Sequence, residues 1–153
     1  MLLRNVKKII RFCIPGEEIS KKILYRHKIS NFFYRHNFNR ISKYLAYKLY
    51  RKYNCCISPK AQIGKNIIFP HPLGIVIGEG AIIGDDCIIY QNVTIGRKKM
   101  DVAEYPELKR GVVVYCNATI IGAITIGEES IVGCNAIVLK SVEPNSKCRG
   151  VVK

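Results

Sequence analysis

The aliphatic residues of this chain recur every six positions between Ile57 and Leu139. In the clearest copies glycine follows the aliphatic residue, and these copies begin at Ile63, Ile77, Ile83, Ile95, Ile126 and Val132. A period of six fits neither the 3.6-residue repeat of a helix nor the two-residue alternation of a strand. It is typical of short strands that are separated by turns and coiled into a solenoid around stacked aliphatic residues. We therefore predict a mainly β solenoid of about four coils over residues 55–153.

Two interruptions of this register mark candidate functional segments. Two extra residues lie between Phe69 and Val76, and the step from Ile95 to Leu108 is thirteen residues long. The second interruption predicts a polar loop over residues 97–107 that protrudes from the coil. Solenoids accept neutral insertions, but a loop on a rigid scaffold is also a common place for binding residues. We favour a function because a histidine lies in the first interruption.

Residues 1–54 differ sharply in charge from the rest of the chain. They hold 14 Lys and Arg residues against two acidic residues, whereas residues 55–153 hold 11 against nine. Apolar residues at helical spacings and the break at Pro15-Gly16 predict two or three short basic amphipathic helices before the coil. Such helices could cap the open end of the coil, contact an anionic membrane surface or bind nucleic acid. We favour membrane contact, since a cap alone needs no such charge, and expect no nucleic-acid binding because no such motif occurs.

Length and cysteine usage bound the class of protein. With 153 residues, the chain is expected to form one domain with a small appendage. No apolar run approaches the roughly 18 residues of a spanning helix, and cations interrupt the apolar residues at the start. The seven cysteines are odd in number and lack metal-ligand spacings, so we expect reduced thiols and a cytoplasmic protein. Cys116 and Cys134, eighteen residues apart, should stack on neighbouring coils.

His71 is the only histidine of the coil and the strongest catalytic candidate. Prolines flank it on both sides, so its backbone is stiff and excluded from regular strand pairing. An imidazole titrates close to neutral pH and can therefore accept a proton as a general base. A lone surface histidine in a turn is common, but its position at the register break favours a catalytic role.

Several segments of the coil share a pattern with a known family. They are ISPKAQIG at 57–64, His71 with GIVIGE at 74–79, IYQNVTIG at 89–96, and VGCNAIVLK at 132–140 with VEPN at 142–145. Together residues 57–150 resemble the left-handed β-helix acyltransferases, and among them the serine acetyltransferase group. The resemblance implies a left-handed parallel β-helix that assembles as a homotrimer, with active sites between subunits.

The resemblance implies acetyl transfer from acetyl-CoA to a hydroxyl group, with His71 taking the proton of that hydroxyl. The residues whose positions imply contact with CoA are Gly96, Arg97, Cys116, Cys134 and Lys140. Lys98, Lys99 and Arg110 are weaker candidates for contact with its phosphates. His71 could be oriented by Glu79, by a backbone carbonyl or by a group of the neighbouring subunit.

Departures from the family pattern bear on the acceptor. The family's Arg-His pair in the protruding loop falls on Glu104 and Tyr105, which are candidate acceptor-binding or orienting residues. Its aspartates before the first coil and before the catalytic histidine fall on Cys56 and Pro70. We therefore expect a sugar hydroxyl of a surface polysaccharide or its precursor as acceptor, as in the short capsule and exopolysaccharide members. The basic N-terminal region fits this expectation, because lipid-linked glycans are assembled at the inner membrane face.

Three other functions compete with this one. The main alternative is a serine O-acetyltransferase of cysteine biosynthesis, and another is a non-catalytic solenoid scaffold. The γ-carbonic anhydrases share the six-residue repeat but hold zinc with three histidines, so a coil with His71 alone argues against them. We expect no bound metal.

Overall fold

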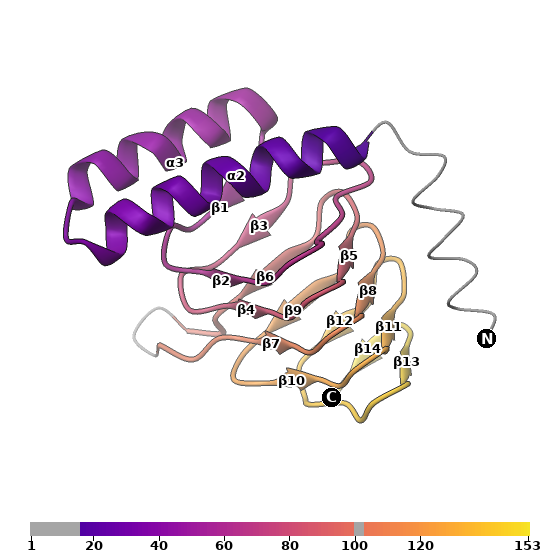
Figure 1. Ribbon diagram of the computed structural model, residues 1–153. Helices are drawn as coiled ribbons and strands as arrows, with labels where there is room; N and C mark the ends of the chain where they lie inside the picture. The colour runs from indigo at the N-terminus through magenta and orange to yellow at the C-terminus, as the bar shows by residue number, and fades with distance from the viewer. Residues whose placement is uncertain (1–15, 100–102) are drawn as a thin grey trace.

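The computed structural model describes residues 16–99 and 103–153, which form two helices followed by a coil of short strands (Figure 1). Helix α2 spans Gly16–Arg35 and helix α3 spans Asn39–Tyr53. The predicted helices are confirmed over these ranges, and the rest of the predicted N-terminal region lies outside the described residues.

Two asparagines define the helix ends. Asn37, between α2 and α3, has a φ of 64°, in the left-handed region that asparagine tolerates better than most residues. Asn54 follows α3 with a φ of 51°, and its N–H donates to the Tyr50 carbonyl at 2.7 Å. This closes the last turn of α3 and directs the chain into the first strand.

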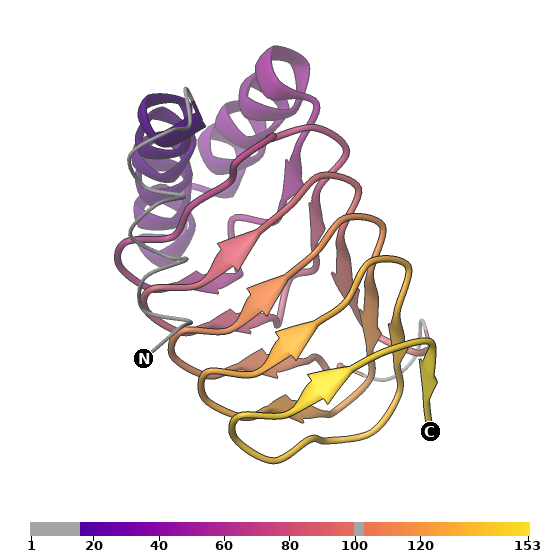
Figure 2. The same ribbon diagram turned by 90° about the vertical axis from the view of Figure 1, so that its right-hand side faces the viewer.

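The strands form three parallel sheets, which are the three sides of the coil. Sheet A contains β1 (Cys56–Ile57), β3 (Val76–Ile77), β6 (Thr94–Gly96), β9 (Thr119–Ile121), β12 (Ile137–Val138) and β14 (Val151–Val152). Sheet B contains β2 (Gln62–Ile63), β4 (Ile82–Ile83), β7 (Glu107–Leu108) and β10 (Thr125–Ile126). Sheet C contains β5 (Ile88–Ile89), β8 (Val113–Val114), β11 (Ile131–Val132) and β13 (Lys147–Cys148). Successive coils therefore stack directly on one another, as Figure 2 shows, and the predicted left-handed β-helix is confirmed.

The repeating aliphatic residues fill the interior of the coil. In sheet A, Ile57 pairs with Ile77 and Ile77 with Ile95, and all three side chains are buried. The small residues four places on are buried as well, for example Ala81 and Ser130, each with 0% of its surface exposed. The register thus reflects the geometry of a narrow core, in which one large and one small side chain alternate along each turn.

Three rows of turns separate the sheets, and we name them by the sheets that they join. Corner AB comprises residues 58–61, 78–81, 97–99 with 103–106, 122–124 and 139–141. Corner BC comprises 64–67, 84–87, 109–112, 127–130 and 143–146, and corner CA comprises 70–75, 90–93, 115–118, 133–136 and 149–150. The first register break therefore lies at corner CA and the protruding loop at corner AB. Glu107, predicted as the end of that loop, is the first residue of β7.

Helices α2 and α3 cap the first coil (Figures 1 and 2). Ile23 and Leu49 are buried and belong to the same core cluster as Phe69 of that coil. The Ser20 hydroxyl receives a hydrogen bond from the Phe69 N–H at 2.9 Å and donates to the Phe69 carbonyl at 3.2 Å. Capping, one of the roles considered for this region, is therefore confirmed. None of the described helices is long and apolar enough to cross a membrane.

Candidate active site

The His71 imidazole is exposed on corner CA, in the turn that contains the two extra residues. The Leu73 N–H donates to the His71 carbonyl at 2.8 Å and tightens the turn between the flanking prolines. The Gly74 N–H donates to the Asn54 carbonyl at 2.9 Å, which ties the turn to the end of α3. His71 is thus held on a stiff backbone with its ring accessible to a substrate.

Two stacked tyrosines lie beside His71. The ring centroids of His71 and Tyr90 are 6.3 Å apart, and the Tyr90 and Tyr115 rings stack at 5.1 Å. Burial raises the pKa of Tyr90, and Tyr115 adds to the effect. The phenol is therefore protonated at neutral pH and can donate a hydrogen bond.

Two thiols continue the same corner. Cys116 and Cys134 are neighbours, as their spacing predicts, and both are free. The hydrogen bond with Cys134 raises the pKa of Cys116, and desolvation raises it further. Cys116 is therefore a neutral thiol at physiological pH, which disfavours a role as nucleophile. A side chain of this size can line a path for a ligand without introducing charge.

Tyr105 and two glycines organise corner AB. A Cβ added at Gly78 would lie 2.7 Å from the Tyr105 ring, and one added at Gly80 would overlap the same ring. Glycine at both positions therefore lets the ring of the protruding loop lie flat against the coil.

Glu79 lies between these glycines and has well-defined partners. Its carboxylate pairs with the Lys60 ammonium at 2.9 Å. The hydrogen bond from Lys60 lowers the pKa of Glu79, and Arg97 and the Tyr105 hydroxyl act in the same direction. Glu79, Lys60, Arg97 and Tyr105 thus form one polar cluster at corner AB.

Open space adjoins Gly96, at the start of the protruding loop. A Cβ added at Gly96 would meet no atom within 4 Å, and one at Gly122 would meet only Ile124, at 4.0 Å. These glycines are adjacent on successive coils, because the Gly122 N–H donates to the Gly96 carbonyl at 3.1 Å. By contrast, a Cβ added at Gly84 would lie 2.8 Å from the Leu108 carbonyl oxygen. The surface beside Gly96 and Gly122 has room for an extended ligand such as the pantetheine arm of CoA.

The predicted site residues therefore divide between the two ends of the sheet A strands. Corner CA precedes these strands and corner AB follows them. His71, Cys116 and Cys134 lie at corner CA, whereas Gly96, Arg97, Glu79, Glu104, Tyr105 and Lys140 lie at or next to corner AB. Lys98 and Lys99 belong to the protruding loop, but Arg110 lies at corner BC, away from both groups.

This division has a direct consequence for Glu79. It does not orient His71 of the same chain, because β3 separates the two and the carboxylate is paired with Lys60. Within one chain, the two groups of residues lie at opposite ends of the sheet A strands.

Sequence reasoning missed Lys60, Tyr90 and Gln91. Lys60 lies one coil before Glu79, but the register of the two coils places it opposite Gly80, so the repeat alone does not predict its pairing with Glu79. Tyr90 and Gln91 occupy the corner one coil beyond His71. Within the described part of the chain, the buried Gln91 Oε1 accepts no hydrogen bond.

Comparison with known proteins identifies the relatives of the chain. No family model matches it. A serine acetyltransferase of Synechococcus elongatus is 33% identical over 143 residues, which make up 93% of this chain and 57% of that protein. The crystal structure of serine acetyltransferase from Vibrio cholerae has a TM-score of 0.81 and 31% identity, and the match covers 84% of this chain and 50% of that one. The chain is a relative of the serine acetyltransferases.

A further serine acetyltransferase, from Brucella abortus, was solved in complex with coenzyme A. It has a TM-score of 0.80 and 26% identity, over 82% of this chain and 53% of that one. The chain spans about half the length of the serine acetyltransferases that it matches. The similarity extends beyond the predicted residues 57–150, since 93% of the chain aligns with the Synechococcus protein.

Proposed function

We propose that this protein is an acetyl-CoA-dependent O-acetyltransferase with L-serine as its acceptor and His71 as its general base. The observation that carries the proposal is the exposed, rigidly held His71 on the coil fold of the serine acetyltransferases. Serine replaces the polysaccharide as the first candidate acceptor, because the relatives in sequence and in fold are serine acetyltransferases.

The proposed chemistry is a direct transfer. The His71 imidazole takes the proton of the acceptor hydroxyl while its oxygen attacks the thioester carbonyl of acetyl-CoA. The carbon–sulfur bond breaks, and the departing CoA thiolate receives the proton from the imidazolium. The Tyr90 ring lies 6.3 Å from the His71 ring, and its hydroxyl is the proposed hydrogen-bond donor to the reacting groups. No metal participates in these steps.

The acetyl donor is proposed to lie along the glycines of corner AB. Open space beside Gly96 and Gly122 supports this path, and Arg97 and Lys140 stand at the same corner with charge suited to the phosphates of CoA. A sugar hydroxyl is the second candidate acceptor. It is favoured by Glu104 and Tyr105, which put a carboxylate and a phenol at the loop positions where the family has its Arg-His pair.

We propose a homotrimer because, within one chain, His71 at corner CA lies apart from the proposed CoA-binding residues at corner AB. The outward-facing residues of sheet A are uncharged, and Val76, Ile137 and Val151 are 38%, 39% and 56% exposed. An exposed apolar sheet face between the two half-sites is suited to contact with further copies. Sedimentation equilibrium should give three times the 17.3 kDa of the chain. A fully active monomer would contradict the proposal.

Release of CoA thiol tests the activity. Wild type, His71→Ala and the remote surface variant Glu128→Ala would be assayed with acetyl-CoA against L-serine and a panel of nucleotide sugars. We expect turnover with serine, a loss of about 10²-fold or more in His71→Ala, and no change in Glu128→Ala. Turnover with sugars alone would transfer the proposal to the second acceptor. Equal rates in wild type and His71→Ala would refute the role of the histidine.

We also propose that helix α3 contacts an anionic membrane surface from the cytoplasmic side. Ile41, Tyr44, Tyr47 and Tyr50 are 43–55% exposed on this helix. The helix carries five Lys and Arg residues and no acidic residue, and Lys48 lies 4.8 Å from the centre of the Tyr44 ring. Aromatic rings interleaved with cations are suited to the headgroup region of anionic lipid.

Flotation with lipid vesicles tests this contact. Because the helices cap the coil, we would substitute Tyr44→Ser and Tyr47→Ser rather than delete them. Wild type should float with phosphatidylserine-containing vesicles at physiological salt, and the double variant should not. Absence of wild type from the vesicle fraction would refute the contact.

A further inference from the structure

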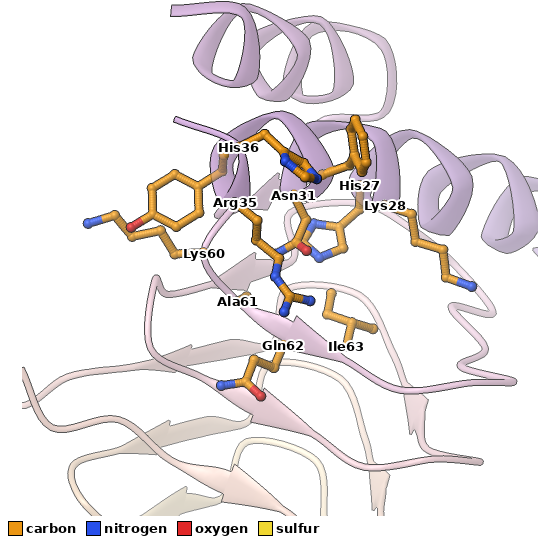
Figure 3. Close-up of a pocket in the computed structure, with 11 residues that line it drawn as sticks. His27, Lys28, Asn31, Arg35, His36, Lys60, Ala61, Gln62 and Ile63 are labelled. Carbon is orange, nitrogen blue, oxygen red and sulfur yellow. The ribbon is translucent and has the colours of Figure 1, made fainter. Parts of the chain in front are cut away.

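A cavity of about 750 Å³ lies between helix α2 and the first coil, away from the His71 corner. Figure 3 shows Arg35 extending from α2 into it toward Gln62 and Ile63 of β2. Lys28 stands at one side and Lys60 at the other.

Side chains of α2 form hydrogen bonds with most of the backbone groups that the first coil directs toward the helix. Asn31 donates to the Pro59 carbonyl at 2.7 Å, and His27 forms a hydrogen bond with the backbone of Ala61. Ser20 bonds both backbone groups of Phe69. These contacts replace the strand that an edge would otherwise pair with.

Ile63 has no such partner from the helix. Gln62 and Gly64 direct their N–H groups to the Ala81 and Ile83 carbonyls of the next coil, so the Ile63 N–H points to the opposite side, toward α2. Within residues 16–99 and 103–153 no hydrogen bond from that N–H is recorded. A backbone donor thus faces the cavity beneath the Arg35 guanidinium.

The charge around this donor is positive. Arg35 and Lys28 line the cavity, and among the described residues that line it none is acidic. No ion pair of Arg35 or Lys28 is found within the described part of the chain. Lys60, by contrast, is held by Glu79 at 2.9 Å. The Arg35 guanidinium above the Ile63 N–H is suited to the oxygens of a phosphate group, and Lys28 adds positive charge at the rim.

The rim of the cavity supplies aromatic surface. The Phe32 and His36 rings lie 4.3 Å apart, and Tyr34 lines the cavity near Lys60. A ligand larger than phosphate could therefore rest an apolar or ring portion against them. The cavity volume also exceeds what a single phosphate group needs.

We propose that this cavity is a binding site for a small phosphorylated molecule, which Arg35 and the Ile63 N–H hold by its phosphate while Lys28 adds positive charge at the rim. The site is separate from the proposed acetyl-transfer site, whose residues lie at corners CA and AB. Its ligand would contact α2 and the first coil together, and would therefore stabilise their junction.

Calorimetric titration with pyrophosphate tests the site in the full-length protein. We would compare wild type with Arg35→Gln and with Arg40→Gln, which removes the same charge from α3 outside the cavity. We expect binding to wild type, a loss of at least about tenfold in affinity in Arg35→Gln, and a change of less than about twofold in Arg40→Gln. Lys28→Gln should also weaken binding, and provides a second variant if Arg35→Gln folds poorly.

Competition separates this site from the acetyl-transfer site. Saturating CoA should leave pyrophosphate binding unchanged, and so should His71→Ala. Displacement of pyrophosphate by CoA to the same extent in wild type and in Arg35→Gln would assign the phosphate to the CoA path and overturn the proposal. Equal losses in Arg35→Gln and Arg40→Gln, or no binding to wild type at about 10 mM pyrophosphate, would overturn it as well.

Discussion

Replacing Ser20 with alanine should destabilise the junction between helix α2 and the coil. The Ser20 side chain is 1% exposed, and its hydroxyl bonds both the N–H and the carbonyl of Phe69. Phe69 lies on the first coil, and among residues 16–99 and 103–153 no earlier strand satisfies these groups. The variant would leave a buried donor and a buried acceptor without their partner.

The expected loss follows from these two groups. A buried backbone group without a hydrogen bond costs about 1–3 kcal/mol. Phe69 is itself 0% exposed, so water cannot readily replace the hydroxyl, although a small local shift can recover part of the loss. We therefore expect Ser20→Ala to lower the free energy of unfolding by about 3 kcal/mol. This is a large share of the roughly 5–15 kcal/mol that stabilises a typical domain.

Urea unfolding followed by circular dichroism measures this loss, and Ser141→Ala is the matched control. The Ser141 hydroxyl also accepts a backbone N–H, that of Thr125 at 3.0 Å, but this bond is exposed to water. The control should change the free energy of unfolding by less than about 0.5 kcal/mol. If Ser20→Ala lost no more than Ser141→Ala, the assignment of Ser20 as the polar link between helix and coil would be refuted.

Three further predictions concern the buried histidine, the loop and the thiols. Burial lowers the pKa of His27 from 6.5 to about 4, so the unfolded chain binds a proton in this range that the folded chain does not. Stability present above pH 6.5 should therefore fall by about 3 kcal/mol as the pH drops to 4, and urea midpoints of wild type and His27→Asn would show the difference. Gly80→Ala should displace the Tyr105 ring and cost about 1–3 kcal/mol in urea unfolding, whereas Gly96→Ala should cost less than about 1 kcal/mol. Among the described cysteines, the exposed Cys134 should react with a maleimide before the buried Cys55, Cys87 and Cys148, as peptide mass mapping would detect.

Each of these predictions has a result that would contradict it. Identical pH profiles in wild type and His27→Asn would show that His27 is not the group that titrates. Equal stability of Gly80→Ala and Gly96→Ala would mean that Tyr105 does not lie on the coil in solution. Rapid labelling of the buried Cys87 in the folded protein would contradict the packing of the core.

The coil was predictable because one physical requirement recurs along it. Each turn must place an aliphatic residue such as Ile77 or Ile95 in the narrow core, which has no room for polar side chains with bound water. The six-residue period of the coil is therefore visible directly in the sequence. The interruptions were predictable for the same reason, since extra residues at His71 and in the protruding loop shift an otherwise regular register.

The polar contacts were not predictable, because they depend on how the corners align in space. Glu79 pairs with Lys60 because successive coils stack on one another. The extra residues near His71 change the sequence separation between the two coils, so the regular six-residue repeat does not predict this pair. The docking of α2 relies on Ser20 and Asn31, whose side chains follow no repeat. Membrane contact was inferred from the positive charge of residues 1–54. The structure shows in addition that α2 and α3 cap the first coil through buried apolar residues, which the charge of the region does not predict.

The separation of His71 at corner CA from Tyr105 at corner AB has a genetic consequence in the proposed trimer. Each active site would combine corner CA of one subunit with corner AB of its neighbour. Two inactive alleles, one mutated at His71 and one in the protruding loop, would then complement each other when co-expressed, because some mixed trimers contain a site with both corners intact. Two alleles mutated at the same corner could not, since no arrangement of their products restores that corner.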